Sequence, residues 1–110
     1  MIPVKNIFKD LPSQTNVEFF EDLIVDPRFK LERIISFGHA TPKGEWYDQE
    51  RDEWVVLLKG SDTLVFEGKE EEIDLFPGDH LLIPAHQKHR VNRTDPDVPS
   101  FWLALYFDKF

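Results

Sequence analysis

The clearest pattern along the chain is an alternation of side chains at the two-residue period of a β-strand, and it begins at Phe29. Successive side chains of a strand point to opposite faces, so this alternation predicts a strand that ends where the segment from Gly38 to Lys43 interrupts it. Its two faces are Leu31, Arg33, Ile35 and Phe37 on one side and Glu32, Ile34 and Ser36 on the other.

A second predicted strand, Glu53 to Lys59, is apolar on both faces. One face holds Glu53, Val55 and Leu57, and the other holds Trp54, Val56 and Leu58. Neither face resembles a solvent-exposed surface, so both must be covered. The turn residues Gly60, Ser61 and Asp62 connect this strand to another at Thr63 to Glu67, which predicts a hairpin.

Further short strands follow at regular spacing, separated by turns rich in proline, glycine and aspartate. They are expected at Ile73 to Phe76, Leu81 to Ile83, His89 to Asn92 and Phe101 to Phe107. About seven to nine short strands in one chain are typical of an antiparallel sandwich or barrel. The fold class predicted here is therefore all-β.

The first thirty residues are harder to interpret. Val4 to Phe8 has the composition of a short strand, and Val17 to Val25 fits either a strand or a single helical turn. We expect an irregular N-terminal segment, residues 1–30, that packs on the barrel or on a partner subunit. Residues 31–110 then form the barrel.

Composition limits the chain to one domain. A length of 110 residues with 41% hydrophobic content is enough for one core and too short for two. The eight prolines and five glycines favour a turn-rich β architecture over a helical bundle. The absence of cysteine excludes disulfides and thiolate ligands, so any metal must bind through nitrogen or oxygen.

Charge and segment composition narrow the partners. The N-terminal residues lack the basic start and apolar core of a signal peptide, and no apolar segment is long enough to span a membrane. A cytoplasmic location and no membrane partner are the expectations. The net charge of −8 argues against nucleic acid, because phosphate binding needs a basic surface.

The region between Gly44 and Asn92 resembles the cupins, small β-barrels of jelly-roll topology, also described as double-stranded β-helices. Their first motif contains His-x-His, then a glutamate, and ends at a glycine seven positions after it. Glu53 and Gly60 have that spacing, with Tyr47 and Gln49 where the two histidines would be. The second motif matches as Gly78, Pro84, His89 and Asn92, with the asparagine one residue early and His86 at a turn position that is usually glycine.

The resemblance implies a divalent-metal site in the barrel, because cupin ligands are usually the two histidines and the glutamate of the first motif and the histidine of the second. Only Glu53 and His89 keep these residue types. Period-two geometry places Tyr47 and Gln49 on the same side of the sheet as Glu53. Gln49, Glu53 and His89 therefore form a candidate site for manganese, iron, nickel or zinc, with positions open to water or substrate.

A metal-free interpretation remains open beside it. Glu53 and His89 would then form a buried ion pair or hydrogen bond, with Gln49 completing the network. A neutral amide is a weaker ligand than imidazole. Tyr47 binds metal readily only when ionised, which its high reference pKa opposes.

Four more residues are candidates for chemistry or binding. His86 points either into the pocket, where it would act as ligand or general base, or into solvent. Tyr47 and His86 are the candidate catalytic residues that move a proton. Asp48 and Arg90 are the candidate substrate-binding residues, Arg90 through paired hydrogen bonds to a carboxylate.

Two aromatic residues, Trp54 and Trp102, are expected on outward faces of their strands. Their cover would be either the N-terminal segment or a second subunit, which predicts a homodimer. Cupins also commonly dimerise.

Two functions follow for such a barrel. The first is a metal-dependent enzyme, a dioxygenase or isomerase acting on a small polar metabolite. The alternative is a non-catalytic module that binds a small molecule or sugar without metal.

Overall fold

The structure, a computed structural model of the chain, describes residues 1–13 and 17–108. The expected N-terminal segment and the expected barrel thus each include residues outside these ranges, 14–16 and 109–110. The described strands are β1 (Phe19–Asp26), β2 (Phe29–Ser36), β3 (Asp52–Lys59), β4 (Asp62–Phe66), β5 (Glu72–Leu75), β6 (His80–Ile83), β7 (His89–Arg93) and β8 (Ser100–Phe107). Over the described ranges there is no helix, and hence none that could cross a membrane.

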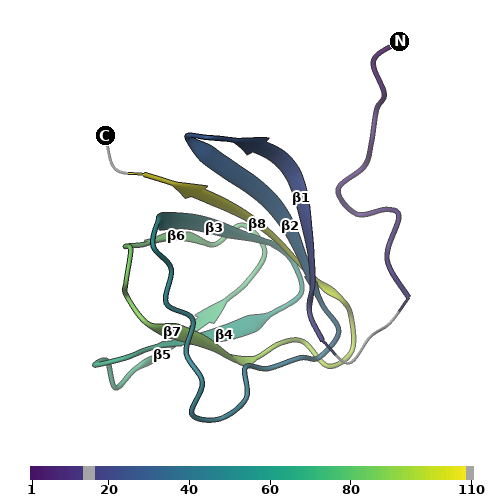
Figure 1. Cartoon of the computed structure of the whole chain (residues 1–110). Coiled ribbons are helices and arrows are strands. Elements are labelled where there is room, and N and C mark those ends of the chain that lie inside the picture. Colours follow the sequence, from purple (N-terminus) through teal and green to yellow (C-terminus); the bar gives the residue numbers. More distant parts are fainter. Residues whose placement is uncertain (14–16, 109–110) are drawn as a thin grey trace.

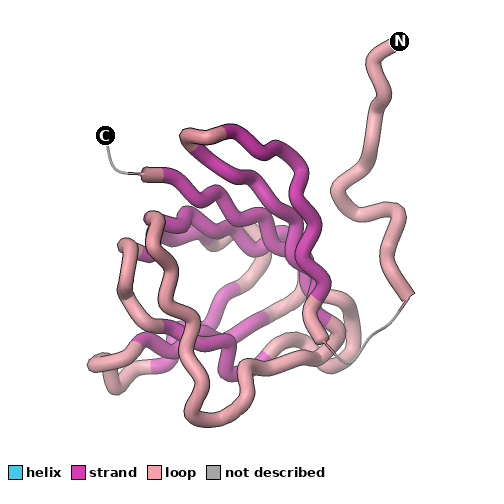
Figure 2. The backbone as a smooth tube through the Cα atoms, in the orientation of Figure 1, coloured by secondary structure: helices cyan, strands magenta, loops and turns pink. Residues whose placement is uncertain are grey.

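The strands form two antiparallel sheets that face each other (Figure 1 and Figure 2). One sheet has five strands in the order β1-β2-β8-β3-β6, and the other has three in the order β5-β4-β7. Neighbours in each sheet are often distant in sequence: β8 pairs with both β2 and β3. The predicted all-β jelly-roll barrel is confirmed, including the strand at β2 and the turns that separate β3 to β8. The hairpin expected across Gly60, Ser61 and Asp62 is wrong, because β3 and β4 belong to different sheets and this turn carries the chain from one sheet to the other.

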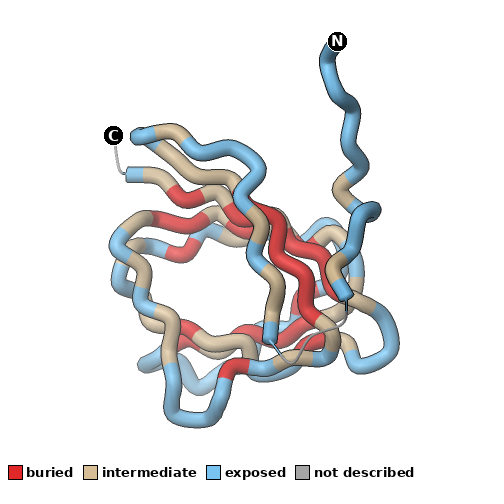
Figure 3. The backbone as a smooth tube through the Cα atoms, turned by 45° about the vertical axis from the view of Figure 1, so that its right-hand side comes forward, coloured by how far each residue is buried: buried red, intermediate tan, exposed pale blue. Residues whose placement is uncertain are grey.

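The core lies between the two sheets (Figure 3). Period-two alternation in β3 places Val55 and Leu57 inside the barrel, where both are buried, while Trp54 is half-buried on the outer face. The expectation for Trp102 was wrong. This residue is 4% exposed and belongs to the core cluster, because its cross-strand partner Leu57 faces inward and paired residues share a face.

The structure resolves both open questions about the first thirty residues. Residues from Phe19 onward form β1, which pairs with β2 at the edge of the large sheet, so strand structure begins before residue 30. The short strand expected at Val4 to Phe8 is absent, since these residues have no ladder partner.

The N-terminal segment instead packs on the outer face of the large sheet, through Arg33 of β2, and Figure 1 shows the segment at the right of the view, beside that sheet. The Arg33 guanidinium donates to the carbonyl oxygens of Ile7, Lys9 and Asp10 at 3.2, 2.6 and 3.2 Å. The ring of Phe8 meets Phe101 edge-on, with ring centroids 5.3 Å apart. One part of the outer apolar face is thereby covered from within the chain.

Candidate functional site

Backbone pairing brings the two sequence motifs together. Tyr47 and His89 form an isolated antiparallel bridge in which each amide N–H donates to the other carbonyl oxygen, at 2.7 and 3.1 Å. The amide of His86 donates to the carbonyl oxygen of Gln49 at 2.8 Å. The loop before β3 is therefore fixed against the start of β7, and Tyr47 and Gln49 point into the barrel as predicted.

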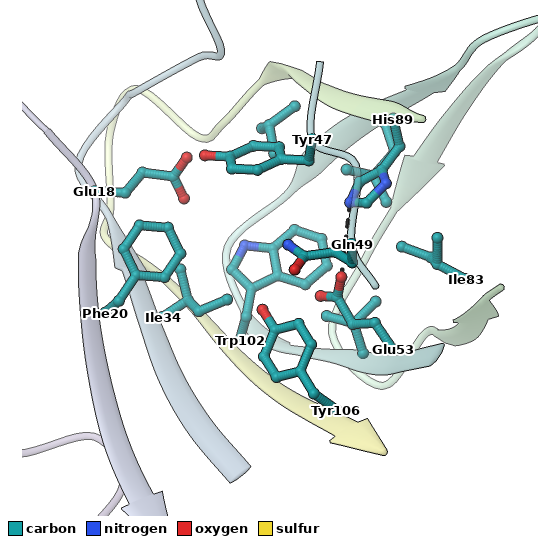
Figure 4. Close-up of a pocket in the computed structure, with 13 residues that line it drawn as sticks. Glu18, Phe20, Ile34, Tyr47, Gln49, Glu53, Ile83, His89, Trp102 and Tyr106 are labelled. Carbon is teal, nitrogen blue, oxygen red and sulfur yellow. Dashed lines mark ion pairs between the residues drawn. The ribbon is translucent and has the colours of Figure 1, made fainter. Parts of the chain in front are cut away.

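A cavity with a volume of about 60 Å³ lies at this end of the barrel (Figure 4). Its wall includes all four residues expected to converge, Tyr47, Gln49, Glu53 and His89. The other lining residues are Glu18, Phe20, Ile34, Val55, Leu64, Ile83, Val91, Trp102 and Tyr106. The cavity combines two carboxyl groups with four aromatic side chains besides His89.

The Glu53 carboxyl group and the His89 imidazole face each other across part of this cavity. Glu53 Oε1 lies 3.6 Å from His89 Nε2, which is too long for a hydrogen bond. His89 Nδ1 is 3.0 Å from the carbonyl oxygen of Gln87. A carbonyl only accepts, so Nδ1 carries the proton and the Nε2 lone pair points toward Glu53.

Glu53 Oε1 has no hydrogen-bond partner within the described part of the chain, although the residue is only 5% exposed. A buried polar atom without a partner carries a desolvation cost. Burial and, to a smaller extent, the nearby charge of Glu32 together raise the pKa of Glu53 to about 7, although a hydrogen bond with Tyr106 opposes this rise. Burial lowers the pKa of His89, so its imidazole is neutral at neutral pH, where the Glu53 carboxyl group is close to the midpoint of its titration.

The pKa of Tyr47 indicates how its hydroxyl group can act in the cavity. Burial, with smaller contributions from the charges of Glu18 and Glu53, raises its pKa to about 12. The phenol therefore stays protonated at neutral pH and acts as a hydrogen-bond donor rather than as a base or an anionic ligand. Figure 4 shows its hydroxyl group directed toward the carboxyl group of Glu18.

Glu18 is a pocket residue that the sequence did not reveal. It precedes β1, and Ser36 Oγ donates to its Oε2 at 2.9 Å. Burial raises the pKa of Glu18, and the hydrogen bond from Ser36 opposes that rise. Its position two residues before Phe20, another lining residue, is the period-two signal that would have placed it, had the segment been assigned as a strand.

Three candidates lie away from the cavity wall. The His86 side chain is largely exposed, at a residue with φ of 63°, and its Nδ1 lies 2.9 Å from Asp48 Oδ1. Arg90 donates to the carbonyl oxygen of Thr41 at 3.3 Å and lies over the ring of Trp46. His86, Asp48 and Arg90 are thus not brought to the pocket with Tyr47 and Gln49.

Comparison with solved structures places this barrel among known proteins. A crystal structure from Ralstonia eutropha JMP134, described as a "putative mannose-6-phosphate isomerase", is 42% identical over 98% of this chain and 100% of that one, with a TM-score of 0.92. A cupin superfamily protein from Desulfitobacterium hafniense DCB-2 is 19% identical over 90% and 84% of the two chains, with a TM-score of 0.72. An RmlC-like cupin from Methanocaldococcus jannaschii, described with a double-stranded β-helix fold, is 15% identical over 90% and 87%, with a TM-score of 0.69.

No protein-family model and no protein of curated function matches the sequence. The fold and the cavity define a small single-barrel β protein whose mostly apolar pocket holds two carboxyl groups and one imidazole. The structural matches, one of them at 42% identity over nearly the whole chain, show more: the chain belongs to the cupin superfamily.

Cupins often carry a divalent metal ion, so the pocket can be tested for donors. Among residues 1–13 and 17–108, no three His, Asp, Glu or Cys side chains cluster as a metal site. The unpartnered Glu53 Oε1 and the Nε2 lone pair of His89 nevertheless face one cavity, and the amide of Gln49 lines it too. One anionic oxygen, one imidazole nitrogen and one neutral oxygen fit a divalent ion, more weakly than a three-histidine set.

Proposed function

We propose that this protein is an isomerase-type enzyme that moves a proton within a small polar metabolite, using a divalent ion held by Gln49, Glu53 and His89. One observation carries the proposal: Glu53 Oε1 is buried without a hydrogen-bond partner, 3.6 Å from the unprotonated Nε2 of His89. Two ligands of one tetrahedral ion at about 2.1 Å lie about 3.4 Å apart, close to this separation. An ion would satisfy both atoms at once.

The chain's own residues supply the proton chemistry. A bound divalent ion would polarise a substrate carbonyl and so acidify the neighbouring C–H bond. Glu18 faces the same cavity and is the general base, since burial raises its pKa toward the range in which a carboxylate takes up a proton readily at neutral pH. Tyr47, protonated because of its raised pKa, donates a hydrogen bond to a substrate oxygen.

The relative with 42% identity supports this reaction type. It is described as a putative isomerase, and aldose–ketose isomerisation requires proton transfer between neighbouring carbons. The alignment covers nearly all of both chains, so the two barrels have the same extent. From that description we therefore take only the reaction class, isomerisation, as support for the proposal.

The metal is tested by elemental analysis of tag-free protein purified without chelator. We expect near-stoichiometric manganese, iron, nickel or zinc in the wild type, loss of it in His89→Ala, and retention in His86→Ala, whose side chain lies outside the cavity. A wild-type protein without metal that also fails to take up any of the four ions would reject the metal site. The metal-free network of Glu53, His89 and Gln49 would then be the better interpretation.

Turnover is tested by proton exchange. Small hydroxyaldehydes and hydroxyketones incubated in D₂O should gain deuterium at the carbon next to the carbonyl group, and Glu18→Gln should slow the exchange by about 10²- to 10⁴-fold. Glu71→Gln, an exposed change of the same type, should leave the rate unchanged. No exchange with any substrate that binds would favour a non-catalytic binding module.

A further inference from the structure

We infer that Asp62 is a positioning residue that acts through the proposed general base: its buried charge controls how readily Glu18 takes up a proton. The inference deepens the proposed function, because Glu18 is the general base of that proposal. It does not depend on the metal ion, since neither carboxyl group belongs to the proposed ligands Gln49, Glu53 and His89. Three features of the structure support it.

The first feature is a pair of buried serine residues that holds both carboxyl groups. Ser36 of β2 and Ser100 of β8 are cross-strand partners, so their side chains share a face of the large sheet, and both are 0% exposed. Ser36 Oγ donates to Glu18 Oε2 at 2.9 Å, and Ser100 Oγ donates to Asp62 Oδ1 at 2.6 Å. The two carboxyl groups are therefore bonded to neighbouring hydroxyl groups in an interior where charges are weakly screened.

The second feature is an environment that favours the charged form of Asp62. The backbone N–H of Asp95 donates to the same Oδ1 atom at 3.2 Å. Burial raises the pKa of Asp62, whereas the hydrogen bonds from Ser100 and Asp95 and the charge of Arg93 lower it. Among the described residues Asp62 forms no ion pair, so no contacting cation cancels its negative charge.

The third feature is the set of groups that act on Glu18. They come from four parts of the fold: Ser36 on β2, His39 in the loop after it, Tyr47 in the loop before β3 and Asp62 on β4. Burial is the main cause that raises the pKa of Glu18. The hydrogen bonds from Ser36 and Tyr47 and the charge of His39 lower this pKa, and the charge of Asp62 raises it. Asp62 is thus the anion of this set, and it disfavours a second negative charge on Glu18.

The charge of Asp62 matters at the step in which Glu18 holds the proton. In the proposed reaction the C–H bond next to the carbonyl group breaks, its electron pair stays on the substrate as an enolate, and the proton forms an O–H bond on Glu18. Glu18 then returns the proton to the former carbonyl carbon while the hydroxyl proton passes to the former carbonyl oxygen, so no proton is gained or lost. A nearby buried anion favours the neutral form of Glu18 and so makes it a stronger base.

Nuclear magnetic resonance of carboxyl carbon atoms in the tag-free full chain, with EDTA present, measures the titration of Glu18 directly. Asp62→Asn keeps an oxygen at the position of Oδ1 and removes the charge, so we expect the Glu18 midpoint to fall by at least about 0.5 pH unit. Ser36→Ala removes a donor to the carboxylate and should raise the midpoint. The exposed change Glu71→Gln should leave it unchanged.

The pH dependence of deuterium exchange gives a second readout. Glu18 must be ionised to take a proton, so the exchange rate rises with pH through the Glu18 midpoint. In Asp62→Asn this rise should move to lower pH by the same interval as the resonance titration. A structural role alone would lower the rate at every pH without moving the rise.

Two results would overturn the inference. A Glu18 midpoint that is unchanged or raised in Asp62→Asn would show that the charge of Asp62 does not act on Glu18. The wild type gives a test that needs no variant, because the carboxyl signal of Asp62 must titrate at lower pH than that of Glu18. The opposite order would mean that Asp62 is neutral when Glu18 takes up its proton.

The inference and the proposed function fail separately. The expected midpoint shifts without deuterium exchange in the wild type would reject the proposed enzyme and retain the effect of Asp62 on Glu18. Exchange with an unmoved Glu18 midpoint would reject the inference and retain the enzyme.

Discussion

At the scale of single residues, ionisation of the Glu53 carboxyl group destabilises the folded protein when no metal is bound. Its unfolded-state pKa is near 4.5 and its folded-state pKa is about 7, mainly because of burial. The stabilisation from the protonated form is fully present below pH 4.5 and is lost as the pH rises to about 7. A shift of this size corresponds to about 3 kcal/mol of unfolding free energy.

Replacing Glu53 by Gln should remove this loss of unfolding free energy at higher pH. In the presence of EDTA, we expect Glu53→Gln to be more stable than the wild type at pH 8 by up to about 3 kcal/mol, and equally stable near pH 4.5. Urea unfolding across this pH range measures the difference. The exposed change Glu71→Gln should show no such trend, and a Glu53→Gln variant less stable than the wild type at pH 8 would contradict the prediction.

The residue scale also shows how far the sequence leads. Spacing within two motifs placed Tyr47, Gln49, Glu53 and His89 around one cavity, because strand periodicity and a short turn constrain the direction of each side chain. Glu18 was not found, since its segment fitted two kinds of secondary structure and so had no assigned face. The direction of a side chain in a turn, as at His86, depends on local φ and is not set by any period.

At the scale of elements, the turn between β3 and β4 depends on Gly60. Its φ is 94°, and a Cβ there would meet Ser100, whose Cα would lie 3.0 Å away. Ser100 cannot move freely, because its hydroxyl group donates to Asp62 at 2.6 Å inside the core. Both the backbone conformation and the space therefore require glycine.

Gly60→Ala should accordingly lower the unfolding free energy by about 2 to 4 kcal/mol. Gly78→Ala is the matched control, since Gly78 has a φ of 97° but nothing within 4 Å of an added Cβ, and we expect a loss of about 1 kcal/mol. Chemical denaturation of both variants measures the difference. Equal losses would show that the contact with Ser100 contributes nothing.

The attachment of the N-terminal segment to the large sheet is a second prediction at this scale. Arg33 is 3% exposed, donates to three backbone carbonyl oxygens of the segment, and forms an ion pair with Glu21 at 2.9 Å. Arg33→Met removes all of these contacts while keeping an unbranched side chain. We expect protease cleavage near Phe8 to become at least about tenfold faster.

The matched control for this experiment is Arg28→Met. Arg28 lies at the β1–β2 turn, is largely exposed and pairs with nearby Asp26. Limited proteolysis followed by mass spectrometry should show little change in this variant. Equal cleavage of the two variants would mean that Phe8 and its neighbours hold the segment without Arg33.

At the scale of the whole molecule, a row of apolar residues crosses all five strands on the outer face of the large sheet. Cross-strand pairing aligns Ile24, Leu31, Leu105, Trp54 and Leu82. Both ends of the row are exposed, Ile24 at 51% and Leu82 at 54%. The N-terminal segment covers the neighbouring surface at Phe101 but leaves this row open.

We therefore predict that a second copy of the chain covers the row, since strands apolar on both faces need cover on both. Sedimentation equilibrium should give twice the chain mass of 13.0 kDa for the wild type and 13.0 kDa for the double variant Ile24→Glu, Leu82→Glu. Ile73→Glu, at an exposed site on β5 of the other sheet, should leave the dimer intact. A wild-type mass of 13.0 kDa at every concentration would mean that the row stays open to solvent.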